Sequence, residues 1–254
     1  MFYSFIEKTE LIKEGFIVKN DIVYFDAKSD DVVKTSFGKS KKMDPYQMKL
    51  PFGIMYSIYT SSKNKEDYTQ ILKAIKGQSS KYNMDQESYN KFLMRSALYM
   101  SKIITTEEID TIILMESSSR ILMDLSNKLH KYLPKYYDFF TYDKGIFKNP
   151  DLSQILIDVG NIKFDEKTIR SIQQTIDRQS KEQYFSIKKF KPDHRKLIKN
   201  WLKIEDKILS KVVDKNVAVI DDIVTTGATI KEASILLENT GAAKVVGLSL
   251  IKGK

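Results

Sequence analysis

The sequence predicts an α/β protein, in which a mostly parallel sheet is flanked by helices and preceded by an N-terminal α+β extension. Short apolar runs alternate with amphipathic segments over the second half of the chain, which is typical of this class. Hydrophobic residues make up 42% and charged residues 30%, so disorder of the whole chain is excluded. We expect an extension at residues 1–50 and one domain at residues 51–254, with its core at 105–254.

The composition excludes several kinds of site. The chain has no cysteine, so it forms no disulfide, zinc–thiolate site, iron–sulfur cluster or thiol nucleophile. His130 and His194 are its two histidines, too few for a histidine-rich metal site. No apolar run approaches the roughly 20 residues that span a bilayer, and no basic segment precedes the short apolar stretch at the start. We therefore expect a cytoplasmic protein.

Strand and helix signals in the first half come from apolar spacing and turn residues. Alternating or β-branched runs predict strands, and apolar residues three or four positions apart predict helices. The expected elements are a hairpin of residues 16–18 and 22–25, a strand at 52–59, and helices at 67–75 and 85–104.

The second half alternates strand and helix more clearly. Short apolar runs predict strands at 111–115, 155–159, 217–220 and 245–251. Amphipathic spacing predicts helices at 121–132, 169–178, 196–209 and 230–239. Strands separated by helices indicate a parallel sheet covered on both faces.

Residues 217–230 carry the clearest chemistry. Four apolar residues predict a buried strand, and Asp221 and Asp222 follow at its carboxyl end, where open α/β sheets bind ligands. A turn rich in threonine then leads into a helix, and it offers hydroxyls, backbone N–H groups and the positive end of a helix dipole to a phosphate. The residues of this turn are Thr225, Thr226, Gly227, Ala228 and Thr229.

The two carboxylates need a different ligand group, because they repel phosphate. Carboxylates accept hydrogen bonds from hydroxyls and bind Mg²⁺, so a ribose 5-phosphate satisfies both features. An ordinary helix N-cap is the alternative, but capping requires one such residue, whereas two acids and three threonines stand in nine positions. We expect the pair at the solvent-facing end of its strand, so that Asp222→Asn preserves the fold.

This segment resembles the phosphoribosyl-pyrophosphate (PRPP) signature of the type I phosphoribosyltransferases: an apolar strand, two acids, two apolar residues and Thr-Thr-Gly-x-Thr. The resemblance covers about residues 110–252, and weaker similarity to competence-protein F-like phosphoribosyltransferases extends to residues 55–59 and 71–77. It implies the phosphoribosyltransferase fold, Mg²⁺ as cofactor, and catalytic or metal-binding roles for Asp221 and Asp222. In 6-oxopurine enzymes of this family an aspartate usually stands at the position of Thr225, so threonine favours another acceptor.

The same resemblance implies a loop for pyrophosphate after the strand at 111–115. Small polar residues and an arginine at a helix N-terminus suit this anion, although serine caps before helices are common. Glycine, frequent in the family's version of the loop, is absent. The loop residues are Ser117, Ser118, Ser119 and Arg120.

A basic stretch precedes the strand of the acid pair. Residues 181–215 hold eleven Lys and Arg against five Asp and Glu, a net charge of +6 out of +9 for the chain. Family members carry here a flexible loop that closes over PRPP, and we expect such a lid at residues 188–195, disordered without ligand. A solvated surface is the alternative. The residues expected on pyrophosphate are Lys188, Lys189, Lys191 and Arg195, with catalytic roles for the last two.

Together these features predict a Mg²⁺-dependent phosphoribosyltransferase that transfers ribose 5-phosphate from PRPP to a nitrogenous base and releases pyrophosphate. The expected partners are PRPP, pyrophosphate and a nucleobase-like acceptor, with a homodimer left open. The alternative is a non-catalytic sensor of PRPP or nucleotides, or a competence-type protein that acts with nucleic acid. Few aromatic residues are interleaved with the basic ones, which disfavours nucleic acid without excluding it.

Overall fold

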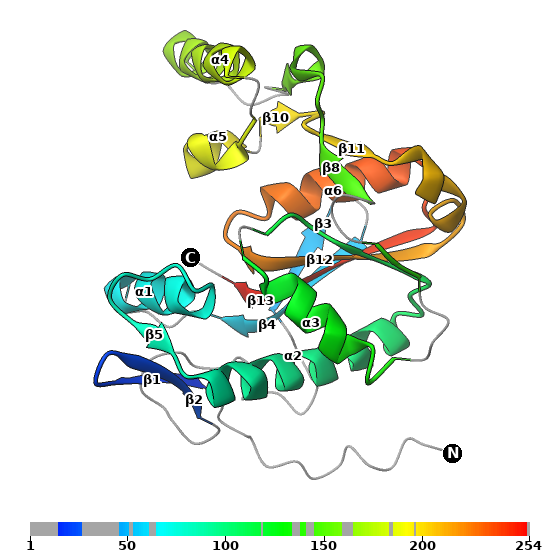
Figure 1. The fold of residues 1–254 in the computed structure, drawn as a ribbon. Coiled ribbons are helices and arrows are strands. Elements are labelled where there is room, and N and C mark those ends of the chain that lie inside the picture. Colours follow the sequence, from blue (N-terminus) through cyan, green and yellow to red (C-terminus); the bar gives the residue numbers. More distant parts are fainter. Residues whose placement is uncertain are drawn as a thin grey trace.

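The computed structural model describes residues 15–26, 46–50, 53–60, 65–117, 119–133, 138–140, 145–158, 165–182, 185–195 and 197–252. These residues form a sheet with helices on both faces, and a layer of short strands and helices, inserted between β7 and β12, lies above it in Figure 1. The elements are β1 (Gly15–Lys19), β2 (Ile22–Asp26), β3 (Tyr46–Leu50), β4 (Gly53–Thr60), α1 (Lys65–Ile75), β5 (Asn83–Met84), α2 (Gln86–Thr106), β6 (Thr111–Leu114), α3 (Ile121–Leu129), β7 (Asp138–Phe140), β8 (Ile146–Lys148), β9 (Leu156–Ile157), α4 (Glu166–Lys181), α5 (Pro192–Arg195), β10 (Ile198–Lys199), β11 (Leu202–Ile204), β12 (Asn216–Val224), α6 (Ala228–Asn239) and β13 (Lys244–Lys252), with 3₁₀ turns at Leu152–Gln154, Ile187–Lys189 and Asp206–Lys211. Across these ranges, none of the helices combines the length and apolar character that crossing a membrane requires.

The main sheet has the strand order β3-β4-β13-β12-β6-β7. Each neighbouring pair from β4 to β7 is parallel, and β3 pairs antiparallel with β4 at one edge. The register aligns Ile220 of β12 with Leu114 of β6 and Leu248 of β13. This mixed α/β architecture, a mostly parallel sheet flanked by helices, confirms the predicted fold class at that level.

Two apolar cores cover the two faces of the sheet. On one face α1, α2 and α3 pack against residues that include Ala218 and Ile220. On the other face α6 and the inserted layer pack against residues that include Val217 and Val219. Because successive residues of a strand point to opposite faces and both faces are covered, residues 217–220 of β12 are apolar without interruption.

The N-terminal strands are tied to the sheet and to α2. The predicted hairpin is present as β1 and β2, and Asn20 and Asp21 turn it with φ angles of 50° and 59°. Phe16 packs on Phe92 of α2 with ring centroids 5.1 Å apart. Strand β3 lies within the predicted extension, yet it belongs to the main sheet. The division at residue 50 stays a prediction.

Most predicted elements are present with shifted bounds, but the helix predicted at 196–209 is wrong. The chain forms β10, β11 and a 3₁₀ turn there. Asn200 takes a left-handed conformation with φ = 60°, which interrupts any helix. Leu202 and Ile204 are buried and Lys203 between them is exposed, a strand pattern stabilised by pairing with β8. Of the strand predicted at 155–159, residues 155–158 are described and form only the two-residue β9, and Val159 lies outside the described residues.

Candidate functional site

The connections that follow β6 and β12 leave these neighbouring strands in opposite directions. Strand β6 continues through α3 to β7, and β12 continues through α6 to β13 on its other side. Helices α3 and α6 lie on opposite faces of the sheet (Figure 1). Such a topological switch point leaves a crevice at the carboxyl ends of both strands, where open α/β sheets bind ligands.

The threonine turn joins the end of β12 to the first turn of α6. Gly227 has φ = 74° and ψ = 9°, a left-handed conformation that favours glycine. Thr226 Oγ1 accepts a long hydrogen bond of 3.4 Å from the N–H of Ala228, and Lys252 Nζ donates to the carbonyl of Thr225 at 2.9 Å. One hydrogen bond within the turn and one from the Lys252 side chain therefore stabilise it. The positive end of the α6 dipole lies at the crevice.

The acid pair lies within β12, not beyond its end. Asp221 and Asp222 are only 9% and 5% exposed, so the prediction that they stand at a solvent-facing end is wrong. The strand runs on to Val224 because β13 pairs with it as far as Lys252. Burial, with the neighbouring Asp222 carboxylate as a second cause, raises the pKa of Asp221 well above its usual range, to about 7.

Asp222 has compensating donors on both of its oxygens. Lys76 Nζ lies 2.6 Å from Oδ2, and Ser117 Oγ donates to the same oxygen at 2.6 Å. The backbone N–H of Ile223 donates to Oδ1 at 2.6 Å. The ion pair and these hydrogen bonds replace the hydration that the Asp222 carboxylate loses on burial.

A cavity of about 340 Å³, the main cavity, opens beside this pair. Its volume lies in the range of small-molecule sites. The lining brings the acid pair and the whole threonine turn together with basic side chains from other elements. The lining residues are Lys76, Glu116, Ile187, Lys188, Arg195 and residues 221–229.

The predicted lid is a folded segment in this structure. It forms a 3₁₀ turn at Ile187–Lys189 and the short helix α5. Phe190 is buried, with its ring centroid 5.8 Å from that of Phe185. Arg195 Nε donates to the carbonyl of Phe190 at 3.0 Å. The sequence did not predict these anchors, because one depends on Phe185 outside residues 188–195 and the other on a contact between the Arg195 side chain and the backbone of Phe190.

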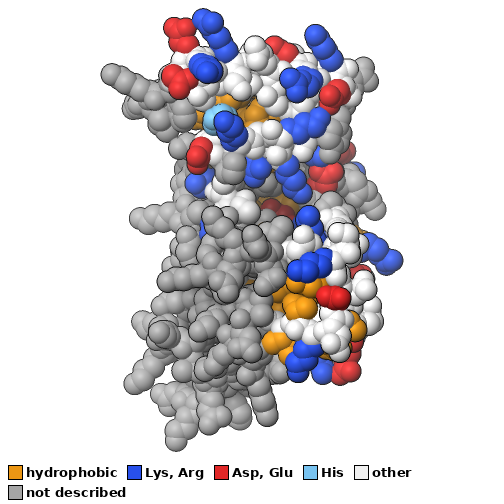
Figure 2. All heavy atoms as spheres, turned by 90° about the vertical axis from the view of Figure 1, so that its left-hand side faces the viewer, with side chains coloured by type: hydrophobic (Ala, Val, Ile, Leu, Met, Phe, Trp, Pro, Cys, Tyr) orange, Lys and Arg blue, Asp and Glu red, His pale blue; other side chains and the backbone are white. Residues whose placement is uncertain are grey.

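The four basic residues predicted on pyrophosphate separate into two groups. Lys188 and Arg195 line the main cavity. Lys189 instead forms an ion pair with Glu182 at 2.5 Å. Lys191 is exposed and does not line the cavity. Figure 2 shows Lys and Arg side chains gathered on the upper part of one face, at the height of α4 and α5 in Figure 1, with acidic side chains between them.

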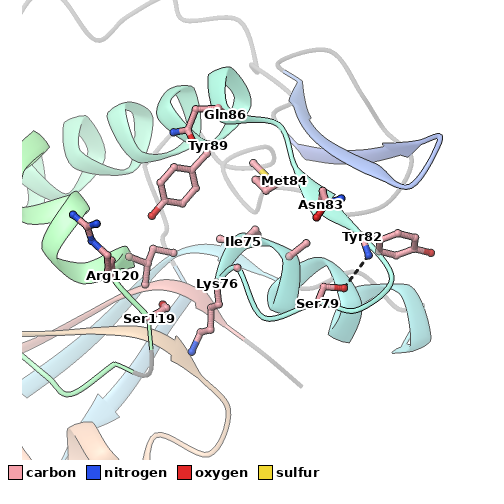
Figure 3. A pocket seen from close by; sticks show the side chains of 13 residues that line it. Ile75, Lys76, Ser79, Tyr82, Asn83, Met84, Gln86, Tyr89, Ser119 and Arg120 are labelled. Carbon is pink, nitrogen blue, oxygen red and sulfur yellow. Dashed lines mark hydrogen bonds between the residues drawn. The ribbon is translucent and has the colours of Figure 1, made fainter.

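The predicted serine loop is divided in a similar way. Ser117 touches Asp222, and its Oγ lies 3.2 Å from that of Ser119. Ser118 lies outside the described residues. Ser119 and Arg120 line a second cavity of about 380 Å³ between α1, α2 and α3 (Figure 3). The structure thus brings Ser117 to the acid pair and places Ser119 and Arg120 at the neighbouring cavity.

The second cavity has a mixed lining. Ile75 and Met84 contribute apolar surface, and Gln86 and Asn83 contribute amide groups (Figure 3). The hydroxyl of Tyr89, which also lines it, donates to Asp124 outside the lining. Lys76 borders both cavities, although its ammonium is directed to the acid pair.

Two charged residues of the main cavity, Lys76 and Glu116, were not predicted from the sequence. Lys76 follows α1 and reaches Asp222 from 146 positions earlier in the chain, so local spacing gave no signal beyond the resemblance at residues 71–77. Glu116 lies just beyond β6 and pairs with Lys148 of β8 at 2.7 Å. The position of Glu116 at the carboxyl end of a predicted strand was a signal that could have selected it.

The described carboxylates do not form a ready metal site. In the described ranges, no three His, Cys, Asp or Glu side chains cluster as a metal site requires. Asp221 Oδ1 accepts the N–H of Asp222 at 2.8 Å, and both oxygens of Asp222 are engaged. Mg²⁺ commonly binds one or two carboxylates together with substrate phosphates and water. The pair fits Mg²⁺ as part of such a joint site and not as a resident site.

Comparison with known proteins finds distant likenesses among solved structures. No family model matches the chain, and no curated protein matches it. Among solved structures, a hypoxanthine phosphoribosyltransferase from Staphylococcus aureus matches with 12% identity and a TM-score of 0.33. The match covers 64% of each chain, so this chain spans less than two thirds of that protein. A likeness at this identity and TM-score does not establish a function for this chain.

Proposed function

We propose that this chain is a phosphoribosyltransferase that transfers ribose 5-phosphate from PRPP to a nitrogenous base. The observation that supports this most strongly is that the threonine turn and the acid pair line one cavity at the switch point of the sheet. A phosphate suits the helix N-terminus and its hydroxyls, and ribose hydroxyls suit the carboxylates.

In the proposed complex the 5-phosphate accepts hydrogen bonds from the backbone and hydroxyls of residues 225–229. Gly227 allows the backbone to approach closely. The ribose hydroxyls donate to Asp221 and Asp222. Burial favours the protonated form of Asp221, whereas Asp222 lies beside the Lys76 ammonium.

The proposed reaction breaks the bond between C1 of ribose and a pyrophosphate oxygen and forms a bond from C1 to the acceptor nitrogen. Pyrophosphate leaves with the electron pair, and the acceptor nitrogen loses its proton to water. The carboxylates stabilise the positive charge that develops on the ribose, and Lys188 and Arg195 stabilise the negative charge on pyrophosphate. Ser117, Ser119 and Arg120 are proposed as further pyrophosphate ligands, and Lys189 and Lys191 reach it only after movement of their segment.

Mg²⁺ is the proposed cofactor. When bound together with pyrophosphate, it would neutralise negative charge on the leaving group as a Lewis acid. The carboxylates that would hold it in that joint site are Asp221 and Asp222. The acceptor is proposed to be a base other than a 6-oxopurine, because Thr225 stands where such enzymes of the family usually carry aspartate.

Pyrophosphate release tests the proposal. The protein is incubated with PRPP, Mg²⁺ and a panel of purine, pyrimidine and pyridine bases, with Asp221→Asn as the matched inactive variant. We expect release with at least one base in the wild type and a large loss in the variant. If PRPP does not bind in calorimetry at millimolar concentration, the proposal is wrong.

A non-catalytic sensor of PRPP or nucleotides is the second candidate. The observation that favours it is the saturation of Asp222 by Lys76, Ser117 and Ile223, which leaves a strong carboxylate fully engaged before any ligand binds. PRPP binding without pyrophosphate release for every base in the panel would support this candidate over the enzyme.

A further inference from the structure

Lys76 forms a nearly buried ion pair at the edge of the proposed site. Its ammonium is 2.6 Å from Asp222 Oδ2, and the two side chains are only 11% and 7% exposed. Ser117 donates to the same oxygen, so the cation and the hydroxyl together occupy one side of the carboxylate. Pairs this buried are held in place more firmly than surface pairs, because breaking one leaves an uncompensated charge.

The end of α1 fixes the position of Lys76. The N–H of Gly77 donates to the carbonyl of Ala74 at 2.9 Å, and that of Gln78 donates to Lys73 at 2.7 Å. Gly77 has φ = 66°, so these bonds form a Schellman motif with glycine at the left-handed position. Lys76 is the last residue before that turn, and this local structure directs it to a strand far away in the sequence.

The alternation of β12 separates the two carboxylates. Asp222 lies on the same face of β12 as Ala218 and Ile220, which belong to the core beneath α1 and α3. Asp221 lies on the opposite face, with Val217 and Val219. Asp222 therefore lies on the side of Lys76. A divalent cation that bound this carboxylate at Oδ2 would have to take the place that the ammonium holds.

We propose that Lys76 is a positioning residue and the internal counter-ion of Asp222, so that the ligand-free site excludes a divalent cation and accepts one only together with a diphosphate. The diphosphate oxygens take over the Lys76 ammonium, and Asp222 becomes free for ribose hydroxyls or for the cation. This order of binding rests on the proposed function, which identifies the diphosphate. The exclusion of the cation by Lys76 is independent of the proposed function.

Mn²⁺ alone is the probe for this exclusion, because it binds oxygen ligands as Mg²⁺ does and its free form is measured by electron paramagnetic resonance. At a free Mn²⁺ concentration of about 0.1 mM, we expect the wild type to bind no stoichiometric ion. The Lys76→Met variant should bind one ion, with an affinity at least about tenfold higher than that of the wild type. Lys76→Gln keeps a hydrogen-bond donor to Asp222 without the charge, and it provides the same comparison should the Met variant fold poorly.

Three further variants make the test specific. Lys73→Met removes an exposed cation of α1 and should behave as the wild type, as should Lys76→Arg, which keeps the charge. Lys76→Met combined with Asp222→Asn should lose the gained ion. Stoichiometric Mn²⁺ binding by the wild type, or no gain in a folded Lys76→Met or Lys76→Gln variant, would overturn the exclusion.

Inorganic pyrophosphate with Mg²⁺ tests the transfer of Lys76 to the ligand. Its affinity should fall about tenfold in Lys76→Met and stay unchanged in Lys73→Met. Equal affinity in both variants would contradict the transfer. Because the Mn²⁺ measurement needs no PRPP, a failure of the proposed function and a failure of this inference give different results.

Discussion

Asp221 and Asp222 are adjacent in the chain and have opposite surroundings. Asp222 is paired with Lys76, whereas Asp221 accepts one backbone hydrogen bond and has its pKa raised to about 7, by burial first and by Asp222 second. The folded protein therefore binds a proton at Asp221 between about pH 4 and pH 7 that the unfolded chain releases. The free energy of unfolding should decrease as the pH rises through this range, and the loss is complete above it.

Asp221→Asn removes the titrating group and with it this loss of stability at high pH. The amide oxygen of asparagine can still accept the hydrogen bond from the N–H of Asp222. We expect the variant to be more stable than the wild type at pH 8, by at least about 1 kcal/mol, and the difference to disappear near pH 4. Urea unfolding at both pH values measures it. An equal difference at the two pH values would show that the raised pKa is not the cause.

Asp222→Asn should have the opposite effect. It leaves the Lys76 ammonium, only 11% exposed, without its counter-charge, and should lower the free energy of unfolding by roughly 1–3 kcal/mol at pH 7. Combining it with Lys76→Met, which removes the stranded cation, should recover part of this loss. A free energy of unfolding equal to that of the wild type would instead support the solvent-facing pair that the sequence alone predicts.

Sequence reasoning at the residue scale identified the acid pair and the threonine turn, since their chemistry lies in nine consecutive positions. It could not find Lys76 or the pairing of Glu116, because these contacts form only when α1, β6, β8 and β12 meet. It also placed the pair beyond the strand. Burial of a polar residue depends on the strands alongside, which the local pattern does not contain.

At the scale of elements, Gly247 of β13 lets α6 approach the sheet. A Cβ at this position would lie 2.6 Å from Ile230 Cγ2 and 3.0 Å from Met55 Cγ. Ile230 belongs to the first turn of α6, directly after the threonine turn. The position of the phosphate-binding turn proposed here therefore depends on a glycine about twenty residues away.

Gly247→Ala should lower the free energy of unfolding by about 1–3 kcal/mol and weaken PRPP binding, because Ile230 and the start of α6 must shift. Chemical unfolding and calorimetry measure the two effects. Ile230→Ala removes the side chain that the new methyl meets, so the double variant should lose less than the sum of the single changes. Strict additivity would show that the close contact is not the cause.

The segment of the predicted lid offers a second test at this scale. It is anchored by Phe190 and Arg195, but Lys188 and Arg195 also line a cavity beside the acid pair. We expect pyrophosphate to supply the countercharge for these cations and to slow trypsin cleavage at residues 188–195 several-fold. Cleavage at the same rate with and without saturating pyrophosphate would show that the segment does not respond to the ligand.

At the scale of the whole molecule, the alternation of strands and helices was enough to predict the parallel sheet. Continuous apolar runs such as residues 217–220 are typical of strands buried on both faces. The inserted layer was predicted poorly, because β8 to β11 are two or three residues long and are stabilised by pairing between distant segments. Residues 196–209 show this well, since their amphipathic spacing fits a helix and Asn200 breaks it.

The order of the strands also explains why one cavity collects residues from distant parts of the chain. The switch point between β6 and β12 places Ser117, Asp222 and the start of α6 at one edge, and α1 adds Lys76. Each group alone has an ordinary structural role, as a cap, a turn or an ion pair. Their convergence on one cavity is what supports a phosphorylated sugar as the ligand.

Binding of PRPP to the wild type and to Thr226→Val combined with Thr229→Val tests the central claim most directly. Valine keeps the shape of threonine and removes the hydroxyl, so each charge-assisted hydrogen bond lost should cost about 1–3 kcal/mol. In calorimetry with Mg²⁺ we predict one PRPP per chain for the wild type and an affinity at least about tenfold lower for a folded double variant. Equal affinity in the two proteins would contradict the assignment of the 5-phosphate to this turn.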